Sequence, residues 1–247
     1  MELKGKVALV TGGGRGIGKA ISLELGRQGC SVAIVVRSGV EAAEAVAHAI
    51  EEMGGRAMAI PTDVADFAQA GSVVASVREQ LGRFDILVCN AGITRDGVSW
   101  KMTEEAWDTV IDVNLKGYFN YCRAAAQIFK EQGSGKIVAV SSINGLRGKF
   151  GQCNYSAAKA GGIALAKSLA KELGRFGVNV NVVAPGMVET EMAANIPASF
   201  LETARAETAL GRIAAPEEVA SVVAFLCSER ARHITGEVIK VDGGQYI

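Results

Sequence analysis

Histidine is scarce in this sequence, whose 247 residues include only His48 and His233. Neither histidine belongs to an HExxH motif or stands among cysteines in a metal-ligand pattern. We therefore expect no metal site and no histidine-activated nucleophile. Any acid–base chemistry has to come from other side chains.

An excess of charge is also absent, because 26 Lys and Arg residues balance 26 Asp and Glu residues. A nucleic-acid or anionic-membrane partner requires a basic excess, so we expect neither. The five cysteines are widely spaced and form no CxxC motif, which is typical of buried thiols in a reducing compartment. No apolar run is long enough to span a bilayer, and the N-terminus leads into a strand without a signal peptide. These features predict a cytoplasmic protein.

Short β-rich apolar segments alternate with helical segments along the chain. Strands are expected at 7–10, 32–36, 57–60, 86–89, 137–140, 178–183 and 238–241. Helices are expected at 17–28, 40–53, 69–81, 104–130, 157–173 and 216–226. This alternation predicts an α/β fold with a doubly wound parallel sheet covered by helices on both faces, in a single domain over 1–247. The stretch 185–211 shows no clear period, and we expect it to be an irregular substrate lid.

A glycine-rich turn joins the first strand to the first helix, and its glycines include Gly12, Gly16 and Gly18. Glycine lets the backbone turn tightly and approach a pyrophosphate, which binds at the N-terminus of the following helix. A glycine-rich turn alone is a weak signal, because such turns also act as simple connectors. Its place between a strand and a helix at the N-terminus favours a nucleotide site.

Six motifs occur in an order that resembles the short-chain dehydrogenase/reductase superfamily. They are Gly12-x-x-x-Gly16-x-Gly18, Asn90-Ala91-Gly92, Asn114, Ser142, Tyr155-x-x-x-Lys159 and Pro185-Gly186. The resemblance covers nearly the whole chain. It implies a Rossmann-type sheet of seven strands and, usually, a tetramer.

Tyr155 and Lys159 stand four residues apart at the start of a helix and so share one face. A tyrosine with a pKa of about 10 exchanges protons poorly at neutral pH, and a nearby ammonium and a positive nicotinamide would lower that pKa. Tyr155 could then act as general acid or base toward a carbonyl or an alcohol. The resemblance further implies that Lys159 holds the nicotinamide ribose, that Ser142 hydrogen-bonds the substrate oxygen and that Asn114 holds a water molecule. A YxxxK pattern alone usually marks only a helix surface, but Ser142 thirteen residues before Tyr155 strengthens the catalytic interpretation.

Charge at the end of the second strand bears on the choice of cofactor. An NAD site offers a carboxylate there for the ribose hydroxyls, and an NADP site offers a cation. The sequence has Val36 at the position of the acid, followed by Arg37, and Arg15 lies in the glycine turn. Two guanidinium groups suit a 2′-phosphate, so we expect NADP(H), although Arg37 as an ordinary surface charge is the simpler alternative. With the six motifs, the resemblance also assigns to the cofactor Ile17, Ser38, Asp63, Val64, Asn90, Ala91, Gly92, Pro185, Gly186, Val188 and Thr190.

The segment from Asn144 to Ser156 looks like that of reductases acting on 3-oxoacyl thioesters of acyl carrier protein or of CoA. The residues expected to contact the substrate are Ser142, Asn144, Phe150, Gln152 and Met187. The basic surface of the carrier-protein enzymes is interrupted here by Gly133 and Phe176. A CoA thioester and a cyclic or aromatic ketone therefore stay open as substrates, whereas a catabolic NAD-dependent alcohol dehydrogenase is disfavoured by Arg37 and by the missing carboxylate. A non-catalytic nucleotide-binding module is disfavoured because Tyr155 and Lys159 are both present.

Overall fold

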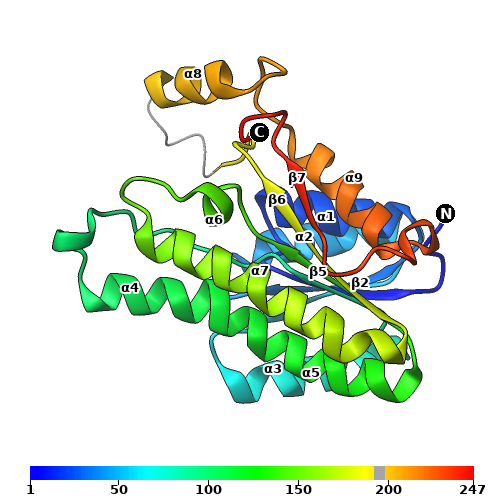
Figure 1. Cartoon of the computed structure of the whole chain (residues 1–247). Helices are drawn as coiled ribbons and strands as arrows, with labels where there is room; N and C mark the ends of the chain where they lie inside the picture. The colour runs from blue at the N-terminus through cyan, green and yellow to red at the C-terminus, as the bar shows by residue number, and fades with distance from the viewer. Residues whose placement is uncertain (192–197) are drawn as a thin grey trace.

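A parallel sheet of seven strands forms the centre of the molecule, with strand order β3-β2-β1-β4-β5-β6-β7 (Figure 1). The computed structural model describes residues 1–191 and 198–247. The strands are β1 (Val7–Thr11), β2 (Ser31–Val36), β3 (Ala57–Pro61), β4 (Ile86–Cys89), β5 (Gly135–Val140), β6 (Val178–Pro185) and β7 (Val238–Val241). The predicted doubly wound α/β fold with seven strands is confirmed.

Alternating side chains of each strand pack into two separate cores, one on each face of the sheet. Leu9 of β1 packs in the core that also holds Tyr121 and Phe129, whereas its neighbour Val10 packs in the core that holds Ile21 and Val223. This follows from the two-residue period of a strand, whose successive side chains point to opposite faces. Because both faces are covered, the central strands β1 and β4 are continuously apolar up to Thr11 and Cys89, where they end.

Helices cover both faces in the way that these two cores require (Figure 1). One face carries α1 (Gly16–Arg27), α2 (Val40–Glu52) and α9 (Pro216–Cys227). The other carries α3 (Phe67–Leu81), α5 (Gly117–Gln132) and α7 (Cys153–Leu173). The remaining helices are α4 (Glu104–Ile111), α6 (Asn144–Arg147), α8 (Ala198–Glu207) and the short turns η1 (Ser99–Lys101), η2 (Asp112–Lys116), η3 (Gly174–Phe176) and η5 (Glu229–Ala231).

The direction of the strand order reverses between β1 and β4, which pair side by side through Val10 and Val88. Chains leaving these two strands turn to opposite sides of the sheet and open a crevice at its carboxyl edge. That edge is where open parallel sheets bind ligands. The fold therefore directs attention to the loops that follow β1, β4 and β5.

Three local differences from the sequence prediction affect the site. The helix expected at 157–173 begins at Cys153, so that Tyr155 lies inside its first turn. The helical region expected at 104–130 is interrupted by a π-helical turn over Asp112–Lys116. The stretch 185–211 is not irregular throughout, because Ala198–Glu207 form α8; residues 192–197 of that stretch lie outside the described residues.

Within the described part of the chain, none of the helices combines the length and the apolar character that crossing a membrane requires.

Candidate active site

The glycine turn is tied to the end of β4 by hydrogen bonds from both strands. The Thr11 hydroxyl accepts hydrogen bonds from the backbone N–H groups of Asn90 (3.0 Å) and Ala91 (3.1 Å). In return, the Asn90 amide donates to the carbonyl oxygens of Thr11 and Gly12, both at 3.1 Å. Asn90 therefore fixes the backbone of the turn across the crevice between β1 and β4.

Glycine is required in this turn by close approach and by backbone conformation. A Cβ at Gly18 would lie 2.0 Å from the Gly12 carbonyl oxygen, and one at Gly12 would lie 2.9 Å from the Ala91 Cα. Gly12 and Gly16 have φ angles of +65° and +52°, which disfavour any side chain. Among the described residues no side chain caps the N-terminus of α1, and its first turn carries no acid. The helix thus presents its backbone N–H groups to an anion.

The expected NADP-selecting residues lie in the glycine turn and at the end of β2. Arg15 in the turn and Arg37 after β2 are exposed, and Val36, the last residue of β2, is buried at 8% exposure. Arg37 forms an ion pair with Asp63 at 3.9 Å, in which both side chains are largely exposed. Asp63 is itself oriented by accepting a hydrogen bond of 2.9 Å from the Ala65 N–H. Ser38 is exposed next to Arg37, and Val64 is buried.

The first two turns of α7 place Tyr155 and Lys159 on one face of the helix. The Lys159 ammonium lies 5.6 Å from the centre of the Tyr155 ring and donates a hydrogen bond of 2.7 Å to the Val140 carbonyl. Lys159 is only 6% exposed, and burial lowers its pKa from 10.5 to about 8. A charge held in a buried position acts strongly on its neighbours.

The pKa of Tyr155 differs from the sequence expectation. Burial raises the pKa of this phenol to about 12, the hydrogen bond with Ser142 opposes the rise, and the negative charge of Asp96 adds to it. In the protein without cofactor, the lysine therefore does not lower the tyrosine pKa as expected, because the penalty for desolvating a phenolate is the larger effect. Tyr155 keeps its proton at neutral pH and is poised as an acid.

The neighbours Ser141 and Ser142, which follow β5, have different roles. Ser141 donates a hydrogen bond of 3.0 Å to the backbone carbonyl of Lys159 and so holds α7 against the sheet. Ser142 faces the tyrosine side, where its oxygen accepts a hydrogen bond of 3.1 Å from the Asn144 N–H. Strand alternation explains the difference, and it agrees with the choice of Ser142 as the substrate-facing serine.

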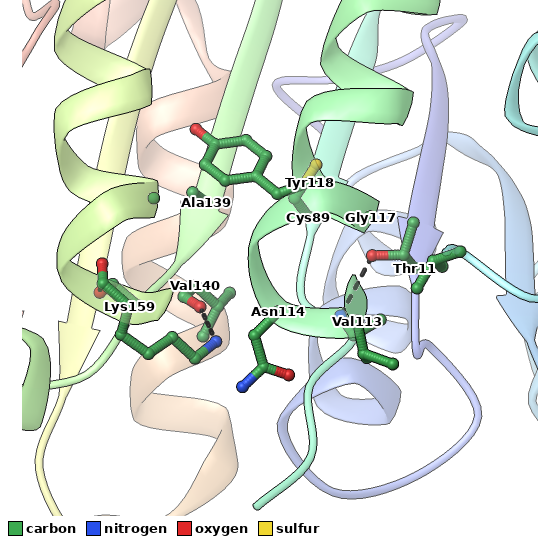
Figure 2. Close-up of a pocket in the computed structure, with 13 residues that line it drawn as sticks. Thr11, Cys89, Val113, Asn114, Gly117, Tyr118, Ala139, Val140 and Lys159 are labelled. Atoms are coloured by element: carbon green, nitrogen blue, oxygen red, sulfur yellow. Dashed lines mark hydrogen bonds between the residues drawn. The ribbon is translucent and has the colours of Figure 1, made fainter. Parts of the chain in front are cut away.

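Asn114 lies in the π-helical turn, where its side chain reaches the loop after β4. Its amide oxygen accepts from the Ile93 N–H (2.8 Å), and its amide nitrogen donates to the Ile93 carbonyl (2.9 Å). A Cβ at Gly92 would lie 3.4 Å from the Lys159 nitrogen and 3.5 Å from the Asn114 oxygen, so glycine keeps the space between them open. Figure 2 shows Lys159 and Asn114 side by side at the cavity they line. The centre of a water molecule can occupy about 20 Å³ of this cavity, which is enough room for one water.

The residues expected to contact substrate are spread around the mouth of this site. Asn144 and Gln152 are brought together, since the Asn144 amide donates to the Gln152 oxygen at 3.1 Å. Phe150 is 84% exposed and contributes no packing to the site in this state. The Met187 N–H donates to the Gln245 side-chain oxygen at 3.0 Å.

The segment after β6 borders the site from the other side. The Pro185 carbonyl accepts a hydrogen bond of 3.0 Å from the Ile143 N–H, which links the ends of β5 and β6. Gly186 packs closely on Asp242, because a Cβ there would lie 2.9 Å from the Asp242 Cβ and 3.1 Å from its Cα. Val188 is buried, and the Thr190 side chain lies 3.4 Å from the position of a Cβ on Gly16. Thr190 therefore faces the glycine turn, as the motif order predicts. Ile17 follows that turn as the second residue of α1.

The sequence prediction gave no individual role to two residues that hold the site together. Asp96 accepts a hydrogen bond of 2.9 Å from the Gln152 amide. Asn154 is fully buried and donates to the carbonyls of Arg95 (2.9 Å) and Ala106 (3.1 Å). An asparagine directly before Tyr155 is a signal in the sequence, because an amide that becomes buried has to find partners. Its partners lie 59 and 48 residues away along the chain and have no local signature.

Comparison with known proteins agrees with this geometry. A family model described as enoyl-(acyl carrier protein) reductase matches residues 12–245 of the chain. The chain belongs to the short-chain dehydrogenase/reductase family. It is therefore an oxidoreductase. The family expected from the ordered motifs is confirmed.

Individual relatives of this dehydrogenase/reductase are similar over its whole length. It is 44% identical to 3-oxoacyl-[acyl-carrier-protein] reductase FabG of Thermotoga maritima, with 100% of both chains covered. It is 40% identical to the protein of the same name from Escherichia coli K12, again over 100% of both chains. A crystal structure of a short-chain alcohol dehydrogenase from Sinorhizobium meliloti 1021 superposes with a TM-score of 0.95 at 35% identity, covering 99% of this chain and 97% of that one.

Proposed function

We propose that this protein reduces a 3-oxoacyl thioester to the 3-hydroxyacyl thioester with NADPH. The observation that carries the proposal is the convergence of Ser142, Tyr155 and Lys159 at the carboxyl edge of the sheet, next to the glycine turn. The full-length relatives named as 3-oxoacyl-[acyl-carrier-protein] reductases supply the substrate class. Acyl carrier protein and CoA both remain carriers for the assay to compare.

The residues present fit a dinucleotide phosphate. The close approach at Gly12 and Gly18 and the uncapped N-terminus of α1 suit a pyrophosphate, and Arg15 and Arg37 suit a 2′-phosphate. When bound, NADPH supplies the hydride for the carbonyl carbon. Lys159 would hold the nicotinamide ribose, and Asn90 would support the cofactor through the turn. Asp63 and Val64 would border the adenine.

The side chains of this protein supply the proton and the orientation. The Ser142 hydroxyl donates a hydrogen bond to the carbonyl oxygen, and Tyr155 transfers its phenolic proton to that oxygen as negative charge develops on it. A tyrosine whose pKa is about 12 holds this proton at neutral pH, so the phenol is present in the form that can donate it. The cavity between Lys159 and Asn114 has room for the one water through which the proton could be replaced.

The remaining proposals concern assembly and the cover of the site. Exposed alanines of α7, namely Ala157, Ala160 and Ala164, form a smooth stripe that suits close helix packing in a two-fold symmetric homotetramer. α8 covers the substrate side, where Glu207 accepts hydrogen bonds from Arg147 (3.3 Å) and Gln245 (3.1 Å). α8 belongs to the stretch 185–211 that we expected to form a lid. Light scattering that reports a monomer at micromolar concentration would contradict the tetramer.

The test of function follows the loss of NADPH absorbance with purified protein and four substrates. These are a 3-oxoacyl thioester of acyl carrier protein, acetoacetyl-CoA, an enoyl-CoA and a cyclic ketone. We expect turnover of the 3-oxo thioesters, formation of the 3-hydroxyacyl product and no reduction of the enoyl thioester. Turnover restricted to the enoyl thioester or to the cyclic ketone contradicts the proposal.

The matched variants separate the proposed acid from other tyrosines. Tyr155→Phe should abolish reduction and leave NADPH binding nearly intact. Tyr121→Phe is the control, because its hydroxyl is buried without a hydrogen-bond partner among the described residues. Its removal should leave turnover unchanged and stabilise the fold slightly. Wild-type turnover in Tyr155→Phe would exclude this tyrosine as the acid.

A further inference from the structure

Asp96 is held at the mouth of the active site by the backbone on either side of it. The Arg95 carbonyl accepts a hydrogen bond of 2.9 Å from the buried Asn154, and the Gly97 N–H donates one of 2.8 Å to the Gly151 carbonyl. Gly151 lies just before α7, and Asn154 lies in its first turn. The Asp96 carboxylate is therefore fixed relative to Tyr155, although its side chain reaches solvent.

The Asp96 carboxylate sets the orientation of the Gln152 amide. Gln152 is 6% exposed and donates a hydrogen bond of 2.9 Å to Asp96 through its nitrogen. An ionised carboxylate only accepts hydrogen bonds, so the amide nitrogen has to face it and the amide oxygen has to face away. That oxygen accepts a hydrogen bond of 3.1 Å from the Asn144 side chain.

Asn144 joins this amide to Ser142. Its side chain donates to the Gln152 oxygen, and its backbone N–H donates a hydrogen bond of 3.1 Å to the Ser142 oxygen. Because Asn144 donates at both ends, these bonds fix the position of the Ser142 oxygen and do not pass on a donor–acceptor order. The Ser142 O–H stays available to donate toward a substrate oxygen.

The charge of Asp96 also acts on Tyr155 directly. The charged group that shifts the pKa of the phenol is Asp96, from the loop after β4. The Lys159 ammonium, on α7 itself, lies 5.6 Å from the ring centre. From β5, Ser142 contributes a hydrogen bond. Burial is the largest cause of the raised tyrosine pKa, and the carboxylate of Asp96 adds to it. The carboxylate therefore helps the acid to keep its proton.

We propose that Asp96 is a positioning residue for carbonyl reduction, which acts through Gln152 and Asn144 to hold the Ser142 hydroxyl in place for the substrate oxygen. The inference rests on the proposed function. It assigns Gln152 and Asn144 to the support of Ser142, in addition to the contact with substrate that the sequence led us to expect.

The test exchanges the donor and the acceptor of the hydrogen bond between Gln152 and Asp96. Gln152→Glu places a second carboxylate against Asp96 and should lower kcat about tenfold or more, with a much smaller effect on KM. The loss should lessen as the pH falls, because two facing carboxylates share a proton and a shared proton restores the missing donor. Asp96→Asn alone should lower kcat by a smaller factor, about threefold, because its amide still offers an acceptor.

The double variant Asp96→Asn/Gln152→Glu decides the matter. It reverses the donor and the acceptor and restores the bond, so we expect kcat within about threefold of the wild-type value. Asp108→Asn on α4 is the matched control for removing one exposed carboxylate, and it should not change kcat. Losses that multiply in the double variant, or a Gln152→Glu loss that is the same at every pH, would overturn the proposal.

A second readout needs neither substrate nor cofactor. Ionisation of Tyr155 is followed by ultraviolet absorbance, with Tyr155→Phe subtracted to remove the other tyrosines. Asp96→Asn should lower the pKa of Tyr155, and Asp108→Asn should leave it in place. If the wild-type protein reduces no 3-oxo thioester, the proposed function fails while this titration still tests Asp96. An unchanged titration in Asp96→Asn would refute the direct effect of its charge on Tyr155.

Discussion

The guanidinium of Arg37 lies 3.9 Å from the carboxylate of Asp63, at the point where the neighbouring strands β2 and β3 end. Both side chains are largely exposed, so the pair is held weakly in water. A 2′-phosphate carries two negative charges and offers better acceptor geometry than this distant carboxylate. The pair therefore keeps Arg37 near the adenosine end of the crevice without preventing it from binding phosphate.

Cofactor preference should depend on Arg37. We expect the wild-type protein to bind NADPH at least about tenfold more tightly than NADH, which corresponds to 1.4 kcal/mol. Arg37→Ala should remove most of this preference by weakening NADPH binding alone, and Val36→Asp added to it should favour NADH. Dissociation constants from fluorescence titration measure both cofactors. Arg78→Ala, which removes a guanidinium paired with Glu131 instead, is the control. Equal wild-type affinities would show that Arg15 and Arg37 are only surface charges.

The glycine turn should not tolerate a methyl group at Gly18. A Cβ there would lie 2.0 Å from the Gly12 carbonyl, so the turn would have to move away from the pyrophosphate position. Gly18→Ala should abolish NADPH binding and lower the free energy of unfolding. Gly71→Ala is the matched control, because a Cβ at this exposed position of α3 meets nothing within 4 Å. It should stabilise the protein by about 0.5–1 kcal/mol. Tight NADPH binding by Gly18→Ala would contradict the assignment.

The order of elements and the location of the site could be predicted from the sequence, because both follow from local patterns. Buried parallel strands are continuous apolar runs, and the residues that follow them, such as Arg37, Asn90 and Ser142, meet at one edge of the sheet. The sequence places the start of α7 too late, at Ala157, because the residue at its N-cap, Gln152, is not one that signals a helix start. The polar neighbours of Tyr155 also interrupt the helical pattern.

The contacts between distant segments could not be predicted. The link from Asp96 to Gln152 joins a loop after β4 to the residue before α7, and neither residue is unusual in its own surroundings. The π-helical turn at Asn114 and the helix α8 also depend on tertiary packing more than on local pattern. The raised pKa of Tyr155 is a further case, because burial outweighs the nearby ammonium that the sequence made visible.

The hydrogen bonds of Glu207 should hold α8 in place. Its pKa is lowered, first by the hydrogen bond with Gln245 and then by Arg147, so these contacts favour the ionised form. Glu207→Ala should speed amide exchange in α8, measured by mass spectrometry, and Glu202→Ala on the same helix should not. Because the pKa is depressed, the protection should be complete above the usual glutamate range and decline as the pH falls through it. Equal exchange in the two variants would contradict the role of Glu207.

Lys159 should destabilise the fold at neutral pH even though the reaction needs it. Burial lowers its pKa from 10.5 to about 8, so below pH 8 the folded protein has to hold a charged, desolvated amine. Between these two values the unfolded chain binds a proton that the folded protein does not bind, and the free energy of unfolding therefore rises with pH. The full shift corresponds to about 3 kcal/mol, and the hydrogen bond to Val140 offsets about 1 kcal/mol of it.

Lys159→Met should therefore abolish turnover while raising the free energy of unfolding at pH 7 by about 2 kcal/mol. The gain should shrink as the pH rises above about 8, because the wild-type amine then loses its proton in the folded state. Urea unfolding of the cofactor-free protein at several pH values measures both effects. Lys167→Met, at an exposed position of the same helix, controls for the methionine side chain and should show neither the gain nor the pH dependence. A variant at Lys159 that is less stable than the wild type at pH 7, with an unchanged slope against pH, would mean that the lysine contributes more through its hydrogen bond than burial takes away.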